Sequence, residues 1–450
     1  MAQNSKYVHW IQSGLFGGLQ KLSIPVSGVL ITMILAHEAL SKEEMGVWAI
    51  FLMITAIIEI IRQGLVKTAL IRYMNYSEES QHRFVMGAAL FLNISITLVL
   101  SLLLFFLSSK LETLLHAPGL AGMLYYFQIG LLFLIPFSHF EWILFGKTMF
   151  KSLFRVYLFR QGLMLLMVVA IFLFKGALTL NELSIIFVSG IFIGAVVAYR
   201  AVYTLVKGSL VFSFEWVKKL FQFGKYVFTT GLSSLVFRNA EQMMLSPLLS
   251  TIIFNAPQNI AMRFVNLSDL PSQTLGDILF PKSAQKDVME NPSLIKYYYE
   301  KTVGASLCFV LPLVLLVVLF PKLIIFVLAG PEYYEAIPYL QLVCFTCITL
   351  AYLKQFGVIL DATGRPHLNL ITISFLAAFH VGISWLMITQ FQFLGAAYAL
   401  LISHAVALVL SQIILHKLFR VNFLNALHYA FKFYPEFYKI LTRKLSWKSR

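Results

Sequence analysis

Apolar runs of about 20 residues recur along the whole chain. A helix of this length crosses the hydrocarbon core of a bilayer while its backbone groups are hydrogen-bonded within the helix. The sequence is 59% hydrophobic and only 12% charged, which excludes a soluble domain of this size. Membrane β-barrels are also excluded, because their strands alternate in polarity over about 10 residues. We therefore predict an all-α integral membrane protein.

Hydropathy predicts twelve transmembrane helices. The first is expected to be retained, because the short segment before it has no small-residue cleavage site. The eighth is the least apolar. The predicted spans are 11–35, 45–67, 84–107, 121–144, 156–174, 184–206, 226–248, 256–280, 303–328, 336–360, 367–388 and 392–415.

The distribution of basic residues predicts the orientation of these helices. Alternate connections, taken together with both termini, hold 28 of the 35 lysines and arginines, whereas the opposite connections hold four. Because positive charge is retained on the cytoplasmic side, both termini are expected to be cytoplasmic. The charge is spread over loops rather than clustered in one domain, which argues against a nucleic-acid partner.

A weak internal repeat predicts two halves. An offset of 213 residues places Gly18, Phe51 and Pro118 on residues of the same type in the second half. Two six-helix halves with the site between them are typical of transporters. The tail mixes basic and aromatic residues, as expected for a helix on an anionic membrane surface or for a segment that fixes topology. The predicted parts are a six-helix bundle at 1–210, a second at 211–415 and a basic amphipathic cytoplasmic tail at 416–450.

The stretch 226–281 is unusually polar for a pair of membrane helices. Asn259, Arg263, Asn266 and Gln273 are spaced so that they share one face of a continuous helix. An arginine near the bilayer centre costs roughly 2.5–3.5 kcal/mol, so such residues face a bundle interior or a water-filled cavity. We therefore predict a polar cavity whose amide side chains contact sugars.

Basic residues near the ends of predicted spans, such as Arg62, Lys67, Arg160 and Lys354, are counted with the cytoplasmic connections. Three others lie deeper inside predicted spans, at Lys21, Arg238 and Arg263. Their functional interpretation is that they hold an anionic group as it crosses the membrane, since arginine suits phosphate oxygens. Their structural interpretation is that they pair with acidic residues and hold helices together. The functional interpretation is favoured for the two arginines, whereas lysine can also extend its ammonium to the interface.

Four acidic residues within the predicted spans are also candidates, whereas Asp277, close to the cytoplasmic end of its span, is expected to be an ordinary interfacial residue. The four acids are candidates for proton or sodium coupling, or counter-charges for the basic residues. The second interpretation is favoured for each residue taken singly, because four acids cannot all be coupling groups. The four are Glu59, Glu141, Glu241 and Asp269.

No nucleotide-binding, nucleophile or metal-ligand motif is found in the sequence. Cys344 and Cys347 form a CxxC pair within an apolar run, where packing is the expected role. We therefore expect no cofactor, no metal and no enzymatic activity.

Several segments resemble a known family. They are EEMGVWAIF (43–51), RQGLVKTALIRY (62–73), FQFGKYVFTTGLSSLVFRNAEQMML (221–245) and ILDATGRPHLNLI (359–371). The chain resembles the polysaccharide exporters, or O-antigen-type flippases, of the multidrug/oligosaccharidyl-lipid/polysaccharide (MOP) flippase superfamily. Glu241 departs from the pattern, because the aliphatic run and glycine common after an acid there are replaced by QMMLSPLL.

The resemblance implies a fold like that of multidrug exporters and a location in the bacterial cytoplasmic membrane. It implies a carrier that turns an undecaprenyl-pyrophosphate-linked oligosaccharide from the inner to the outer leaflet by alternating access. Its cationic cavity would map onto Lys21, Arg238 and Arg263. Other membrane proteins of polysaccharide assembly are possible partners.

Two alternatives remain open. One is a multidrug exporter of the same fold, driven by a proton or sodium gradient. The presence of basic residues in the predicted core argues against it, because exporters of cationic drugs need an excess of buried acids. The other is a membrane polysaccharide polymerase or transferase, which the short outer connections argue against.

Overall fold

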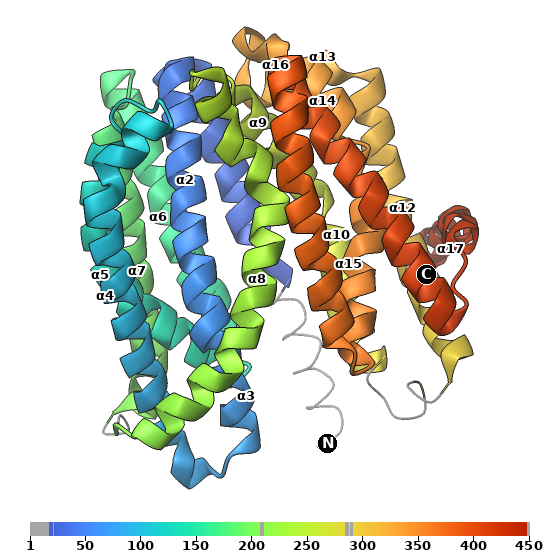
Figure 1. Cartoon of the computed structure of the whole chain (residues 1–450), viewed down its shortest axis with the longest axis horizontal. Helices are drawn as coiled ribbons and strands as arrows, with labels where there is room; N and C mark the ends of the chain where they lie inside the picture. The colour runs from blue at the N-terminus through green and yellow to red at the C-terminus, as the bar shows by residue number, and fades with distance from the viewer. Residues whose placement is uncertain (1–17, 21, 208–210, 284–287, 289–290, 448–450) are drawn as a thin grey trace. The chain divides into compact units, whose positions relative to one another are not determined.

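The computed structural model describes residues 18–447 apart from 21, 208–210, 284–287 and 289–290. All regular elements in these residues are helices, which confirms the all-α prediction (Figure 1). Two compact units form. The first comprises the described residues of Met1–Asn259 with Val327–Glu332, and the second those of Ile260–Phe326 with Tyr333–Arg450.

Eight helices among the described residues are long and apolar enough to cross a membrane, and a bent pair adds a ninth. The pair comprises residues 331–343 and 346–362, bent by 49°. One of the eight is α16 (Pro366–Phe419), which contains a residue with positive φ, Gln392 (φ 52°). This residue falls at the predicted turn between the last two spans. The prediction of twelve spans in two sets of six stays a prediction, as do the sides of the termini.

The first unit follows the predicted order of helices. After the short π-helix η1 (Leu35–Ala39), α5 packs against α4 and α7, while α8 packs against α2 and α4. The elements are α2 (Lys42–Arg62), η2 (Gln63–Lys67), α3 (Thr68–Tyr76), η3 (Glu79–Gln81), α4 (His82–Leu114), α5 (Leu120–Gly146), α6 (Phe150–Lys175), α7 (Leu180–Val206) and α8 (Phe214–Leu249). Because this compact unit includes α8, it extends beyond residue 210. The predicted boundary between two six-helix bundles at residue 210 stays a prediction.

An aromatic cluster forms the core where α2, α5 and α7 meet. The ring of Phe51 lies 5.8 Å from that of Phe127 and 5.5 Å from that of Phe187, both edge to face. Trp48 stacks on Phe51 at 5.5 Å. Such pairs add to the gain from burial, and they fix how the three helices pack.

The second predicted helix is longer than the sequence indicated. It begins with a capping box between Ser41 and Glu44 and continues through α2, η2 and α3 to Tyr76. The helix therefore continues nine residues beyond the predicted end of the span at residue 67. Instead of stopping after Arg62, the helix continues through the π-helical turns of η2, and Arg62 itself is buried.

The second unit is built around Tyr299 and Tyr352, which are buried with Phe356 and Leu415. The Tyr299 hydroxyl donates to the Tyr352 carbonyl at 3.3 Å, which links α12 to α15. The remaining elements are α9 (Asn255–Ser268), which crosses the boundary between the units, α10 (Leu270–Ser283), α12 (Pro292–Leu319), α13 (Pro321–Ala329), η4 (Pro331–Ala336), α14 (Ile337–Val343), α15 (Thr346–Ala362) and α17 (Phe423–Trp447).

The predicted eighth helix is interrupted. The sequence indicated one continuous span over 256–280, but α9 ends at Ser268 and α10 begins at Leu270. The break lies two residues before Pro271, which has no backbone N–H to donate to the preceding turn. The shared face predicted for Asn259, Arg263, Asn266 and Gln273 is therefore divided between two helices.

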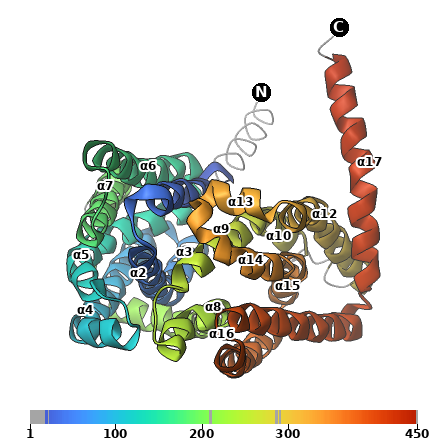
Figure 2. The ribbon, with the colours of Figure 1, turned by 90° about the horizontal axis from the view of Figure 1, so that it is seen from above.

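The C-terminal tail is helical and is attached to α12. The Glu300 carboxylate, only 3% exposed, accepts from the Asn422 backbone N–H at 2.7 Å and from Asn425 Nδ2 at 3.0 Å. Ala426 and Ala430 are buried, which lets α17 approach α12 closely. Seen from above, α17 extends well beyond the other helices of its unit (Figure 2).

Candidate functional site

A buried arginine lies at the centre of a polar cluster in the first unit. Arg62 is 1% exposed, at the end of α2. Its Nε donates to Thr97 Oγ1 at 2.9 Å, and its Nη2 donates to Asn93 Oδ1 at 2.7 Å and to the Leu134 carbonyl at 2.9 Å. A buried guanidinium is tolerated only when such acceptors are in place, so Arg62 ties α2 to α4 and α5.

Two ion pairs surround Arg62. Arg160 Nη2 on α6 lies 3.1 Å from Glu59 Oε1 on α2, and Lys67 Nζ in η2 lies 3.2 Å from Glu141 Oε1 on α5. The Tyr157 hydroxyl donates to the same Glu141 oxygen at 2.8 Å. With Arg62 included, this cluster has three basic and two acidic residues. Its surplus is therefore one positive charge.

The π-helix η2 places Lys67 beside Glu141 and also receives α8. A Cβ atom added to Gly64 would lie 3.0 Å from Phe228 Cα, and one added to Gly224 would lie 2.0 Å from the Leu65 carbonyl oxygen. Small residues at a crossing allow the backbones of two membrane helices to touch. The seventh predicted span thus crosses the second directly at its π-helical turn, a type of irregularity that is frequent at functional sites.

The second unit has its own polar cluster at the break between α9 and α10. Asp269, 5% exposed, accepts at Oδ2 from Lys354 Nζ at 3.1 Å and from Gln273 Nε2 at 2.9 Å. Gln355 Nε2 donates to the Ser272 carbonyl at 2.9 Å. These contacts fix α10 against α15. The Asp269 carboxylate is therefore held by a basic partner.

Arg263 differs from the other buried basic residues. It lies on α9, is partly buried, and its Nε has no hydrogen-bond partner among the residues that the structure describes. Asn266, one turn further along, is exposed. A buried donor without a partner costs about 1–3 kcal/mol, and more when it is charged. Among the lysines and arginines that the structure describes, Arg263 is thus the one with a buried donor that lacks an acceptor.

The other predicted site residues are distributed as follows. Arg238 is exposed on α8 in the first unit, and Glu241, one turn later, is 1% exposed. Asn259 is partly buried near the start of α9. Lys21 lies outside the described residues. Three of the predicted acids, Glu59, Glu141 and Asp269, have a basic nitrogen within 3.2 Å, which favours the counter-charge interpretation for them.

The sequence did not identify the partners of these acids. Arg62, Lys67, Arg160 and Lys354 were counted as charges of cytoplasmic connections, whereas the structure places them in polar clusters within the units. A signal was present, because acids within membrane spans need counter-charges and the nearest basic residues lay at the predicted helix ends.

The chain matches one family profile and one curated relative. The profile of a family described as polysaccharide biosynthesis protein matches residues 38–338. An uncharacterized membrane protein of Methanocaldococcus jannaschii is 27% identical over 232 residues, covering 52% of this chain and 46% of that protein. The chain therefore matches about half the length of this curated relative.

Solved structures share the fold at low sequence identity. The lipid II flippase MurJ, in an inward closed conformation, has a TM-score of 0.77 at 13% identity, with coverage of 93% of this chain and 90% of MurJ. An inward-facing multidrug resistance MATE transporter of the MOP superfamily has 0.71 at 12% identity, with coverage of 89% and 95%.

A third solved structure is a MOP-superfamily transporter from Pyrococcus furiosus, described as having a binding pocket of reversed polarity. It has a TM-score of 0.63 at 12% identity, with coverage of 90% of this chain and 95% of that one. The profile covers more than half of the chain, and the solved structures share its helical architecture. The chain therefore belongs to the family described as polysaccharide biosynthesis protein, and it shares its fold with the lipid II flippase MurJ and with MATE transporters.

Proposed function

We propose that this protein is a flippase that moves a lipid-linked oligosaccharide, joined to its polyprenyl carrier by pyrophosphate, from the inner to the outer leaflet. The observation that carries the proposal is the unpartnered Nε of Arg263. A phosphate oxygen would satisfy this donor, and the guanidinium fork suits phosphate geometry. The proposed location is the bacterial cytoplasmic membrane.

The pairing of the acidic residues supports an anionic substrate. Glu59, Glu141 and Asp269 are each neutralised by a basic partner, and the cluster around Arg62 has a surplus of positive charge. A cationic substrate would instead need unpaired acids. We assign Arg238, Arg263 and Lys21 to the pyrophosphate and Asn259, Asn266 and Gln273 to the sugars.

The second candidate is a multidrug exporter, which the fold shared with MATE transporters favours. In that case the acids would be working groups rather than counter-charges. The two candidates differ in the charge of the substrate, so one assay separates them.

The test uses the full chain in proteoliposomes. A fluorescent polyprenyl-pyrophosphate oligosaccharide is placed in the vesicles, and its appearance in the opposite leaflet is followed by quenching. Protein-dependent movement of this lipid, without efflux of a cationic dye under an ion gradient, is the expected result. Dye efflux without lipid movement would contradict the flippase proposal and favour the multidrug exporter.

A further inference from the structure

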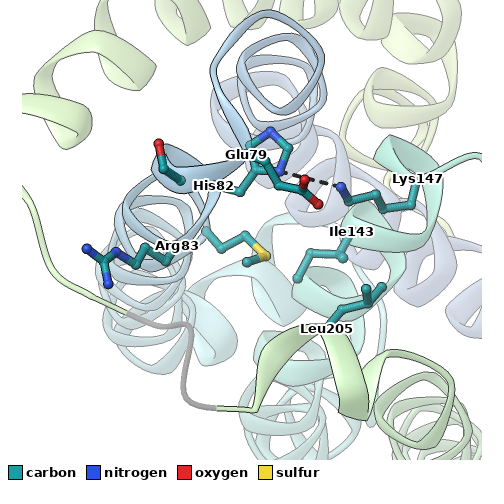
Figure 3. Close-up of a pocket in the computed structure, with 8 residues that line it drawn as sticks. Glu79, His82, Arg83, Ile143, Lys147 and Leu205 are labelled. Atoms are coloured by element: carbon teal, nitrogen blue, oxygen red, sulfur yellow. Dashed lines mark hydrogen bonds between the residues drawn. The ribbon is translucent and has the colours of Figure 1, made fainter.

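A pocket of about 450 Å³ opens at one end of the first unit, where α4 begins and α5 and α7 end (Figure 3). It lies at the ends of three helices that are apolar enough to cross a membrane. Its lining includes Glu79, His82, Arg83, Ile143, Lys147 and Leu205.

Lys147 is a basic residue whose side chain extends into this pocket. Its Nζ lies 3.4 Å from His82 Nδ1, and Figure 3 shows the two side chains meeting across the pocket. An ammonium can only donate, so His82 Nδ1 is the acceptor in this contact. Among the described residues, no carboxylate lies within ion-pairing distance of Lys147, not even that of Glu79. The charge of Lys147 therefore remains available to a ligand.

The residues around the pocket are those expected at the level of lipid headgroups. On α7, Tyr199 and Tyr203 are 45% and 43% exposed, and Lys207 Nζ lies 5.8 Å from the ring of Tyr203. Exposed tyrosines and lysines at helix ends are typical of the membrane–water interface. Leu205, 36% exposed, extends the pocket lining toward the apolar surface of α7.

We propose that this pocket binds the phosphate headgroup of an anionic phospholipid. Lys147 holds the phosphate oxygens, and the acyl chains follow the apolar surface beside Leu205. Arg83, whose guanidinium points outward from the rim in Figure 3, adds attraction for the anionic leaflet. Basic pockets at the ends of membrane helices bind lipid headgroups through the same chemistry. This lipid site is separate from the transport site. The proposal therefore does not depend on which substrate the protein carries.

The test measures lipid affinity with the full chain in nanodiscs. Phosphatidylglycerol is titrated into a phosphatidylcholine bilayer, and retained lipid is counted by native mass spectrometry. Lys147→Gln is expected to weaken phosphatidylglycerol binding about tenfold, the effect of losing a charged hydrogen bond. Lys147→Arg is expected to retain binding, which shows that the fold survives substitution at this position.

Two further variants sharpen the result. Lys218→Gln removes the same charge from an exposed position outside the pocket and is expected to leave the affinity unchanged. Glu79→Gln is expected to strengthen binding, because it removes a negative charge from the lining. If Lys218→Gln lost as much phosphatidylglycerol affinity as Lys147→Gln, the binding would be explained by general attraction between the basic surface and the anionic lipid. A weaker affinity in Glu79→Gln would show that the carboxylate contributes to lipid binding instead of opposing it. Either result would overturn the proposal.

A free phosphate ion could offer Lys147 the same oxygens as a lipid headgroup, so it is tested separately. Inorganic phosphate added to phosphatidylcholine nanodiscs is expected to leave the melting temperature unchanged, whereas phosphatidylglycerol is expected to raise it. An equal rise with inorganic phosphate, lost in Lys147→Gln, would show that the pocket takes a soluble phosphate and not a lipid.

Discussion

The guanidinium of Arg62 lies inside the first unit, where its three hydrogen bonds go to neutral acceptors. The nearby carboxylates of Glu59 and Glu141 are each paired with another basic residue, so the cluster keeps one positive charge in excess. Removing a buried charged partner leaves polar groups without solvent or hydrogen bonds, which costs more than the bonds themselves contribute. Arg62 is therefore expected to determine the stability of the unit.

Arg62→Ala is predicted to lower the free energy of unfolding by about 3–5 kcal/mol, because Thr97, Asn93 and the Leu134 carbonyl lose their donor. Thermal unfolding of the purified protein in detergent measures the change. Arg200→Ala, at an exposed position near the end of α7, serves as the control and is expected to shift stability by at most about 0.5 kcal/mol. If the two substitutions lowered the stability equally, Arg62 would not be the residue that determines the stability of the unit.

At the residue scale, the sequence identified the acids but not their partners. Glu59, Glu141 and Asp269 were recognisable because acids are rare within apolar runs. Their basic partners are 101, 74 and 85 residues away along the chain. Periodicity within one helix carries no information about such distant pairs. They become visible only when helix packing is known.

At the scale of elements, the crossing of η2 and α8 is the most restrictive contact in the first unit. The space for a side chain at Gly224 is occupied by the Leu65 carbonyl oxygen, which cannot move without disturbing the π-helical turn. Any Cβ at this position must therefore separate the two helices. The separation would also move Lys67 relative to Glu141.

Gly224→Ala is predicted to destabilise the protein by about 1–3 kcal/mol through this clash. Gly162→Ala is the matched control, because Gly162 on α6 has no heavy atom within 4 Å of its would-be Cβ. The control is expected to be neutral or slightly stabilising, since alanine is the better helix former. Comparing the two melting temperatures tests the crossing, and a neutral Gly224→Ala would contradict it.

The helices themselves were predictable from hydropathy, whereas their irregularities were not. Runs of apolar residues predicted the order of the helices, and the residue with positive φ in α16, Gln392, falls at a predicted turn. The π-helix after Arg62 has no signature in hydropathy, because it changes hydrogen bonding without changing composition. The break at Asp269 had a visible cause in Pro271, but proline is common enough in membrane helices that it did not compel a break.

At the scale of the whole molecule, the fold class follows from composition, because only helices or closed barrels can satisfy the backbone inside a membrane. The orientation rests on a different argument, the distribution of lysine and arginine. Family membership comes from the sequence profile over 38–338, not from either property.

The predicted orientation can be tested with two reporters. A reporter fused after residue 450 is expected to give a cytoplasmic signal, because the tail is rich in basic residues. A reporter inserted in the short connection between α6 and α7 is expected to give the opposite signal. Signals from the same side, or both reversed, would contradict the predicted topology.

The central claim is that Arg263 holds the pyrophosphate of a transported lipid, and lipid movement in proteoliposomes tests it most directly. Arg263→Ala is predicted to slow the movement of labelled polyprenyl-pyrophosphate oligosaccharide at least about tenfold, because a charged hydrogen bond to the substrate is lost. Arg200→Ala is predicted to transport like the wild type. Equal transport by all three proteins, at equal amounts in the membrane, would contradict the account.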